Sequence, residues 1–296
     1  MLEPISIGTY TDPVHLFEKL NNELRILKNE GIPLDINIDE VGSLMVMDCC
    51  SPEIGECNEV NSLNTVKYSI ANCLADIIVD EWEIRIIKKI VSNDYYYYNE
   101  EEKEIILSKA KEMLNPTGIN MYHQKQRREK VMLKILDYLD SNKDLVLEGF
   151  ISFRLKDYEN ELEGIVNSAV DEFLLEKEYM EFIKLLKYFV EIQEPRIEKI
   201  QVLIKSNGKF SLLDERDKPV KHECLEGLML DSMENEINYD DLLISALITI
   251  APRELILHIE SGVKSVETVT IIQNVFGSRV KKCLGCKKCD NINQTR

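Results

Sequence analysis

Residues 149–195 read GFISFRLKDYENELEGIVNSAVDEFLLEKEYMEFIKLLKYFVEIQEP, the longest stretch of helical periodicity in the chain. Its apolar residues recur in steps of three and four, which places them on one side of a helix. They are Leu155, Tyr158, Leu162, Ile165, Ala169 and Phe173, followed by Tyr179, Phe182 or Ile183, Leu186, and Phe189 or Val190. Pro195 is expected to end the helix, since proline disfavours helical backbone in the residue before it. A polar interruption at residues 176–178 predicts a bend or break there.

The composition is that of a globular protein with an acidic surface. The 296 residues are 44% hydrophobic and 30% charged, and the formal net charge is −17. A chain of this length can form two domains or one large one. Because an acidic surface repels phosphate backbones, we expect no broad binding to nucleic acid, although a local basic patch could still bind.

The beginning of the chain gives no sign of a secretory signal. Residues 1–13 hold neither a basic segment nor an apolar core of the kind that signal peptides need. The most apolar window, residues 242–251, is about half the ~20 residues of a membrane-spanning helix. We therefore expect no membrane span and a cytoplasmic location, where thiols stay reduced and the eight cysteines form no disulfide scaffold.

Residues 1–120 are expected to form a region of strands and helices. Asp12-Pro13 is typical of a helix start, since the carboxylate can cap the first turn and proline fits its first position. Asn99 is expected to cap another helix in the same way. The predicted elements are an edge strand at 3–9, a buried strand at 43–50, a loop at 51–61, and helices from residue 13 toward Gly31, at 63–90 and at 99–114.

The rest of the chain divides into a central helical region, residues 121–195, and a mixed α/β region, residues 196–296. In the mixed region Asn207-Gly208 separates two apolar runs and predicts a β-hairpin, because both turn positions need positive φ. The other predicted elements are a strand at 254–259 and helices at 238–250 and 266–280. The expected fold class is therefore α+β, predominantly helical, with a short N-terminal strand-helix region and a small mixed C-terminal region.

Cys283, Cys286 and Cys289 form the motif that points most directly to chemistry. Consecutive Cys-x-x-Cys steps let thiolates converge on one metal ion, a spacing found in zinc and iron–sulfur sites. We predict a metal site at these cysteines, with zinc favoured over an iron–sulfur cluster; the alternative is a frayed segment whose thiols do nothing specific. The basic neighbours favour the thiolate form; they are Arg279, Lys281, Lys282, Lys287 and Lys288.

A closed zinc site needs a fourth ligand. Cys224 or His222 could supply it if the fold brings either of them near. A three-cysteine site with one open position is the iron–sulfur variant. His258 lies inside an apolar predicted strand, so it is interpreted as a hydrogen-bonded core residue rather than a ligand.

Other clusters favour structural interpretations. The tyrosines at 95–98 are expected to be packed in part and solvated in part. The basic segment 122–130 could contact nucleic acid or phosphate, but a solvated helix face is the expected explanation. The chain contains no glycine-rich phosphate loop, zinc-protease motif or EF-hand loop. Four further cysteines are interpreted as core thiols: Cys49, Cys50, Cys57 and Cys73.

Four phrases of the central stretch carry a family resemblance: GFISFRLKDY, AVDEF, EKEYMEFIKLLKYFV and QEP. They lie at Gly149–Tyr158, Ala169–Phe173, Glu176–Val190 and Gln193–Pro195. In these phrases the chain resembles the YtxC-like family of sporulation proteins from endospore-forming bacteria, and the resemblance extends over most of the chain, including its cysteine-rich end. It implies a role in sporulation with another sporulation protein as partner, and brings no reaction, ligand or catalytic residue.

Three functional hypotheses follow from these observations. The first is a non-enzymatic sporulation protein that acts through protein–protein contacts, with the central helices as its contact surface or merely its core. The alternative is a metal-binding or redox protein that uses Cys283, Cys286 and Cys289. The weakest is a hydrolase or transferase with an unrecognised site, since the abundant carboxylates single out no acid–base pair.

Overall fold

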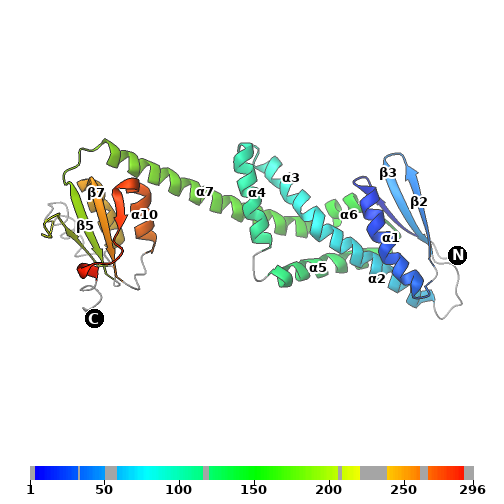
Figure 1. Ribbon diagram of the computed structural model, residues 1–296. Helices are drawn as coiled ribbons and strands as arrows, with labels where there is room; N and C mark the ends of the chain where they lie inside the picture. The colour runs from blue at the N-terminus through cyan, green and yellow to red at the C-terminus, as the bar shows by residue number, and fades with distance from the viewer. Residues whose placement is uncertain are drawn as a thin grey trace, which may run out of the picture. The chain divides into compact units, whose positions relative to one another are not determined.

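The computed structural model describes residues 4–32, 34–50, 59–115, 120–205, 209–220, 239–260 and 266–289 (Figure 1). The chain divides into two compact units, Met1–Leu174 and Leu175–Arg296, each with its own hydrophobic core. Both units combine helices with a four-stranded sheet, and helices predominate. The predicted α+β class is therefore confirmed, while the three predicted regions, 1–120, 121–195 and 196–296, stay a prediction.

The sheet of the first unit has the order β2-β3-β1-β4. Strands β1 (Ile5–Thr9) and β2 (Asp35–Val41) each pair antiparallel with β3 (Leu44–Cys50), and β4 (Asp144–Val146) pairs parallel with β1. The predicted strands at 3–9 and 43–50 are thus present. The prediction that the first of them is an edge strand was wrong, because the sequence could not reveal that β4, some 140 positions later, pairs with its free side.

Within the described residues of the first unit, seven helices lie wholly inside it. Proline occupies the first turn of α1 as predicted, although the Asp12 side chain makes no capping hydrogen bond. At α4 the capping is complete: Asn99 accepts from the backbone of Glu102, whose side chain accepts from Asn99 in return. The helices are α1 (Pro13–Asn29), α2 (Glu59–Ile77), the π-helical turn η1 (Ile78–Trp82), α3 (Glu83–Asp94), α4 (Glu100–Leu114), α5 (Asn120–Ser141) and α6 (Leu147–Arg154).

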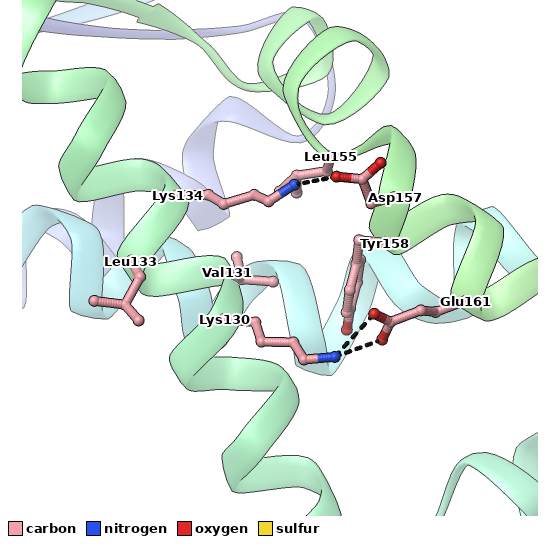
Figure 2. A pocket seen from close by; sticks show the side chains of 8 residues that line it. All are labelled: Lys130, Val131, Leu133, Lys134, Leu155, Asp157, Tyr158 and Glu161. Atoms are coloured by element: carbon pink, nitrogen blue, oxygen red, sulfur yellow. Dashed lines mark hydrogen bonds and ion pairs between the residues drawn. The ribbon is translucent and has the colours of Figure 1, made fainter.

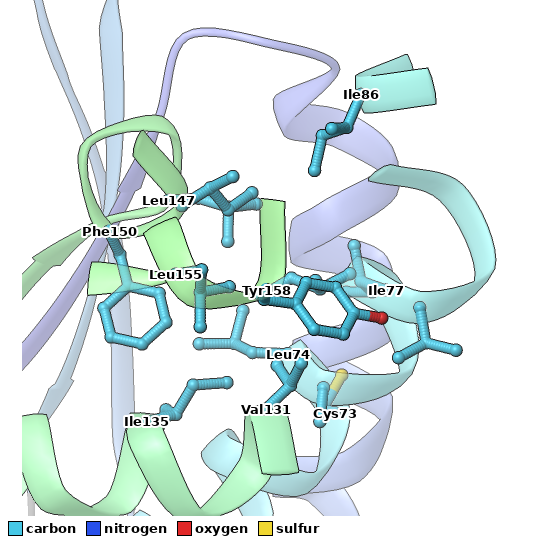
Figure 3. Close-up of a cluster of buried hydrophobic side chains, with 14 of the residues drawn as sticks. Cys73, Leu74, Ile77, Ile86, Val131, Ile135, Leu147, Phe150, Leu155 and Tyr158 are labelled. Atoms are coloured by element: carbon cyan, nitrogen blue, oxygen red, sulfur yellow. The ribbon is translucent and has the colours of Figure 1, made fainter. Parts of the chain in front are cut away.

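The core of the first unit gathers apolar faces from these helices and from the sheet. Figure 3 shows Leu74 and Ile77 of α2 close to Val131 and Ile135 of α5, with Tyr158 beside them. The predicted face of the first helix, at Leu16, Leu20, Leu24 and Leu27, is buried, so its leucine spacing was interpreted correctly. Cys49 and Cys73 are buried core thiols as predicted, whereas Cys57 lies outside the described residues.

The central helix α7 runs uninterrupted from Lys156 to Ile192, and the boundary between the units lies within it. The predicted break at residues 176–178 was wrong, because Glu and Lys are good helix formers and polar side chains leave the backbone hydrogen bonds intact; the alternative, a bend there, stays a prediction. The break instead lies at Leu155, between α6 and α7, where the chain turns and the leucine side chain is fully buried.

The second unit contains a sheet of order β6-β5-β7-β8. Strands β5 (Lys199–Ile204) and β6 (Phe210–Leu213) form the predicted antiparallel hairpin, whose Asn-Gly turn lies outside the described residues. Strand β7 (Glu254–Ile259) pairs parallel with β5 and with β8 (Val280–Lys282). Helices α9 (Tyr239–Ile250) and α10 (Val266–Phe276) contribute Leu243, Leu247 and Ile272 to the core.

The last predicted helix, 266–280, is too long at its end. Helix α10 stops at Phe276, and a single 3-10 turn, η3 (Gly277–Arg279), leads into β8. Gly277 has a φ of 52°, the left-handed conformation that commonly ends a helix. Among the described residues, no helix is long and apolar enough to cross a membrane.

Candidate metal centre

Strand β8 carries the chain to the cysteines. It lies parallel to β7, with Leu257 opposite Lys282, and the backbone amide of Cys283 donates to the carbonyl of Leu257 at 2.9 Å. Cys283 therefore leaves the sheet beside His258, the next residue of β7. The parallel pairing fixes this neighbourhood, since it is set by backbone hydrogen bonds rather than by the flexible thiols.

A turn at Gly285 then reverses the chain. Its φ of 134° lies in a region that residues with a side chain rarely adopt, so glycine is needed at this position of Cys-Leu-Gly-Cys. One helical turn at residues 287–289 follows. The turn and the short helix bring Cys286 and Cys289 back toward the end of β7.

The three cysteines meet at His258. His Nδ1 lies 3.4 Å from Sγ of Cys286 and 3.4 Å from Sγ of Cys289, and the two sulfurs are 3.8 Å apart. With Cys283 included, the four possible ligand atoms all lie within 4.8 Å of one another. His258 and Cys289 are buried, whereas Cys283 and Cys286 are partly exposed.

These separations match those around a single tetrahedral ion. With bonds of ~2.3 Å to sulfur and ~2.0 Å to nitrogen, a tetrahedral zinc ion holds two sulfurs ~3.8 Å apart and a sulfur and a nitrogen ~3.5 Å apart. The observed 3.8 Å and 3.4 Å agree with both. Ligands to different irons of a cluster would lie farther apart, so the geometry fits one ion better than an iron–sulfur cluster.

The protonation of the donors also suits a metal. Burial lowers the pKa of His258, with the positive charge of Lys288 acting in the same direction, so the imidazole stays in its neutral, ligating form. Backbone hydrogen bonds at Cys289 and Lys288 lower the pKa of the Cys286 thiol. Burial raises the pKa of Cys289 to about 11, so this thiol needs a positive partner to become a thiolate.

Lys288 connects the cysteine segment, residues 283–289, to the hairpin. Its ammonium donates to Oε1 of Gln201 on β5 at 2.6 Å and to the Asp217 carboxylate beyond β6. Gln201 in turn donates to Asp217 at 2.8 Å and to the carbonyl of Asp214 at 3.1 Å. The pKa of Asp217 is lowered mainly by the hydrogen bond from Lys288.

The structure thus brings together all three predicted cysteines. It also places His258 beside them, although the sequence analysis interpreted His258 as a core residue and not as a ligand. His258 is buried in its strand as predicted, but one ring nitrogen faces the thiols. The other, Nε2, is buried and has no hydrogen-bond partner among the described residues. The predicted fourth-ligand candidates, His222 and Cys224, lie outside the described residues. Only the pairing of β7 with β8 reveals His258, and no local sequence signal marks that pairing.

The basic side chains of α5 form ion pairs with acidic residues of the first unit. Arg127 donates to Glu83 at 2.8 Å, Arg128 pairs with Asp76, and Lys130 donates to Glu161 at 2.8 Å. Glu83 is fully buried and also accepts from the Tyr158 hydroxyl, whose pKa is raised by burial and then by the Glu83 charge. These basic groups stabilise the helix packing, so they are neither a plain solvated face nor a free phosphate site.

A cavity of about 320 Å³ lies between α5 and α7 (Figure 2). Val131, Leu155 and Tyr158 contribute to its lining, and two ion pairs cross it, Lys130 with Glu161 and Lys134 with Asp157. Every charged group that lines it is therefore paired. The cavity offers less chemistry than the cysteine–histidine cluster.

Comparison with known proteins assigns the chain to a family. The model of the YtxC-like family matches residues 68–281, most of the chain, but ends before Cys283. "Uncharacterized protein YtxC" of Bacillus subtilis (strain 168) is 31% identical over 135 residues, which is 46% of this chain and 47% of that protein. The match thus spans about half the length of this relative. No solved structure is significantly similar to the chain.

Proposed function

The chain belongs to the YtxC-like family, and we propose that its second unit binds one zinc ion through His258, Cys283, Cys286 and Cys289. The observation that carries this proposal is that four possible ligand atoms lie within 4.8 Å of one another, and that three of their separations, 3.4, 3.4 and 3.8 Å, are close to the edges of a zinc-centred tetrahedron.

The proposed site is structural. Four protein ligands fill a tetrahedral zinc ion and leave no position for water or substrate, whereas catalytic zinc keeps one position open. Zinc would hold residues 283–289 against the end of β7. The hydrogen bonds of Lys288 with Gln201 and Asp217 would also attach these residues to the hairpin. The ion would thereby link the last described segment to three strands of the sheet.

Metal analysis of protein purified without oxygen tests the proposal. We expect about one zinc per chain in the unchanged protein and almost none when Cys283, Cys286 and Cys289 are all replaced by serine. Cys50→Ser is the matched control, because Cys50 is also a free, partly exposed thiol but lies in the other unit. Equal metal content in the unchanged protein and the triple variant would contradict the site. A stoichiometric iron content with visible absorption would favour the iron–sulfur alternative.

Limited proteolysis tests the structural role. Lys282 and Lys287 are exposed and lie next to the proposed ligands, so they are cleavage sites for trypsin. Removal of zinc by a chelator should speed cleavage at these lysines several-fold and leave cleavage within residues 68–115 unchanged. Cleavage that ignores the chelator would argue against a metal-held segment.

The exposed apolar residues of α7 favour a second function, protein–protein contact. Phe182, Leu185 and Ile192 are each more than half exposed, and patches of this kind commonly mark interaction sites.

The sporulation role and a sporulation-protein partner remain expectations from the family resemblance. In an endospore-forming host that carries this protein, Phe182→Glu should reduce heat-resistant spores if contact through α7 serves sporulation. Unchanged spore counts in both the deletion strain and this variant would contradict that role.

A further inference from the structure

The second half of α7 presents an apolar face to solvent. We define the α7 face by five large side chains that are each 42–67% exposed. They are Leu175, Phe182, Leu185, Phe189 and Ile192. We propose that this face pairs with the same face of a second copy of the chain, with the two helices antiparallel.

The α7 face is distinct from the side of the helix that belongs to the core. Ile183 and Val190 are buried in the second unit, and they lie seven residues apart on one side of the helix. Phe182 and Phe189 precede them by one residue each, which turns them by about 100° around the helix axis. The helix therefore buries one narrow stripe in its own unit, and no described residue of the chain covers the adjacent stripe of exposed side chains.

The exposed apolar area is comparable to the largest patches on ordinary proteins, which are often functional. Five side chains of roughly 200 Å² each, about half exposed, present on the order of 500 Å², within the ~300–600 Å² of such patches. An apolar groove of about 420 Å³ adjoins Phe182 and continues the apolar surface over Ile244, Ile248 and Ile271. A partner helix on the α7 face can therefore also contact α9 and α10.

The spacing of these residues is that of a helix seam. Leu175, Phe182 and Phe189 recur every seven residues, and Leu185 and Ile192 recur three residues after two of them. Alternating steps of three and four over several turns are typical of two helices packed side by side. A second copy of α7 satisfies this spacing without any further partner, and closed two-fold dimers are the commonest assemblies.

The position of Glu178 indicates whether the two α7 helices run parallel or antiparallel. It occupies the same seam position as Leu185 and Ile192, one heptad earlier, and it is exposed. A parallel pair would place two Glu178 carboxylates opposite each other. An antiparallel pair instead places Leu175 against Ile192, Phe182 against Leu185 and Glu178 against Phe189 of the second copy, so the two Glu178 carboxylates are kept apart. Two like charges at a seam are unfavourable, so the antiparallel pair is the one we infer.

Sedimentation equilibrium of the full chain tests the pairing. We expect a dimer of the 34.3 kDa chain at micromolar concentration, and we expect salt to strengthen it because each copy carries a net charge of −17. Phe182→Glu and, separately, Leu185→Glu should each raise the dimer dissociation constant at least tenfold. Phe153→Glu on α6 is the matched control, because Phe153 is 75% exposed and lies in the other unit.

Circular dichroism keeps the test valid, since each variant must retain the helical signal of the unchanged protein. A monomer at 100 µM would overturn the proposal. It would also be overturned if Phe153→Glu weakened association as much as Phe182→Glu does.

Cross-linking tests whether the two helices are antiparallel. A photo-reactive benzoylphenylalanine replaces Leu175 in a mixture of light and isotope-labelled chains. Cross-links between copies to the peptide that contains Ile192 are expected. Cross-links to the peptide that contains residue 175 of the other copy would overturn the antiparallel arrangement.

Discussion

The two halves of α7 share one apolar period but differ in how many of their apolar side chains are buried. In residues 156–174 the stripe that includes Tyr158, Leu162 and Phe173 is buried in the first unit. In residues 175–192 the same period continues, yet Ile183 and Val190 are buried while Phe182 and Phe189 are exposed. A hydrophobic period therefore predicts that a helix forms, but whether each apolar side chain is buried depends on which other elements the chain supplies.

Polar contacts tie the first half of α7 to other helices of its unit. Tyr158 donates to Glu83, which Arg127 pairs in turn, so the buried end of α7 is tied to α3 and α5. In the second half Lys187 pairs with Glu191, and this ion pair is exposed and 4.0 Å long. Long exposed pairs of this kind contribute little to stability.

The largest expected effect comes from Arg127→Met. Loss of the guanidinium leaves the Glu83 carboxylate buried without its charge partner, which costs about 3–5 kcal/mol. We expect the free energy of unfolding of the first unit to fall by that amount in urea titrations. Lys125→Met is the control, since Lys125 is on the same helix but its ammonium is exposed and 3.9 Å from Glu129. Similar losses in both variants would mean that the buried pair has no special weight.

The next effect compares the two halves of α7 directly. Leu162 is fully buried, so Leu162→Ala should lower the free energy of unfolding by about 2–5 kcal/mol. Leu185 is about half exposed, so in dilute monomeric protein Leu185→Ala should change it by less than about 0.5 kcal/mol. If Leu185→Ala were as costly as Leu162→Ala in the monomer, the second half of α7 would be covered within its own chain.

The smallest effect is a pH dependence at Glu81. Burial by itself would raise the pKa of this carboxyl, but hydrogen bonds from Lys19 and His15, both at 2.8 Å, outweigh burial and lower it. A lowered folded pKa adds stability above the unfolded value near ~4.3, and this contribution is lost as pH falls through the folded pKa. Glu81→Gln should therefore flatten the acid side of the stability curve by at most about 1 kcal/mol. An unchanged curve would show that the pair contributes nothing measurable.

Much of the fold was predictable because its signals are local. The leucine spacing after Pro13, the Asn99 cap and the Asn-Gly sequence at 207–208 are each local signals. The helix, the cap and the pairing of β5 with β6 all lie where these signals predict. Corrections arose where a distant segment decides. Strand β4 makes β1 an interior strand, and β8 replaces the end of a predicted helix because it pairs with β7.

For the same reason, the cysteines of the candidate site could be predicted from the sequence and the histidine could not. Three cysteines at regular spacing are visible in the sequence, and the structure brings them together. His258 lies 25 positions before Cys283 in an apolar strand, where a histidine is usually a core residue. Its role as a possible ligand depends on parallel pairing of two strands, which periodicity and composition do not encode.

X-ray absorption at the zinc K edge, on protein purified without oxygen, tests the central claim most directly. We predict three sulfur neighbours at ~2.3 Å and one nitrogen neighbour at ~2.0 Å. His258→Cys should convert this shell to four sulfurs, and His258→Ala should replace the nitrogen by a solvent oxygen or weaken the binding. A shell of three sulfurs and one nitrogen that His258→Cys leaves unchanged, or a protein that holds no zinc at all, would contradict the site.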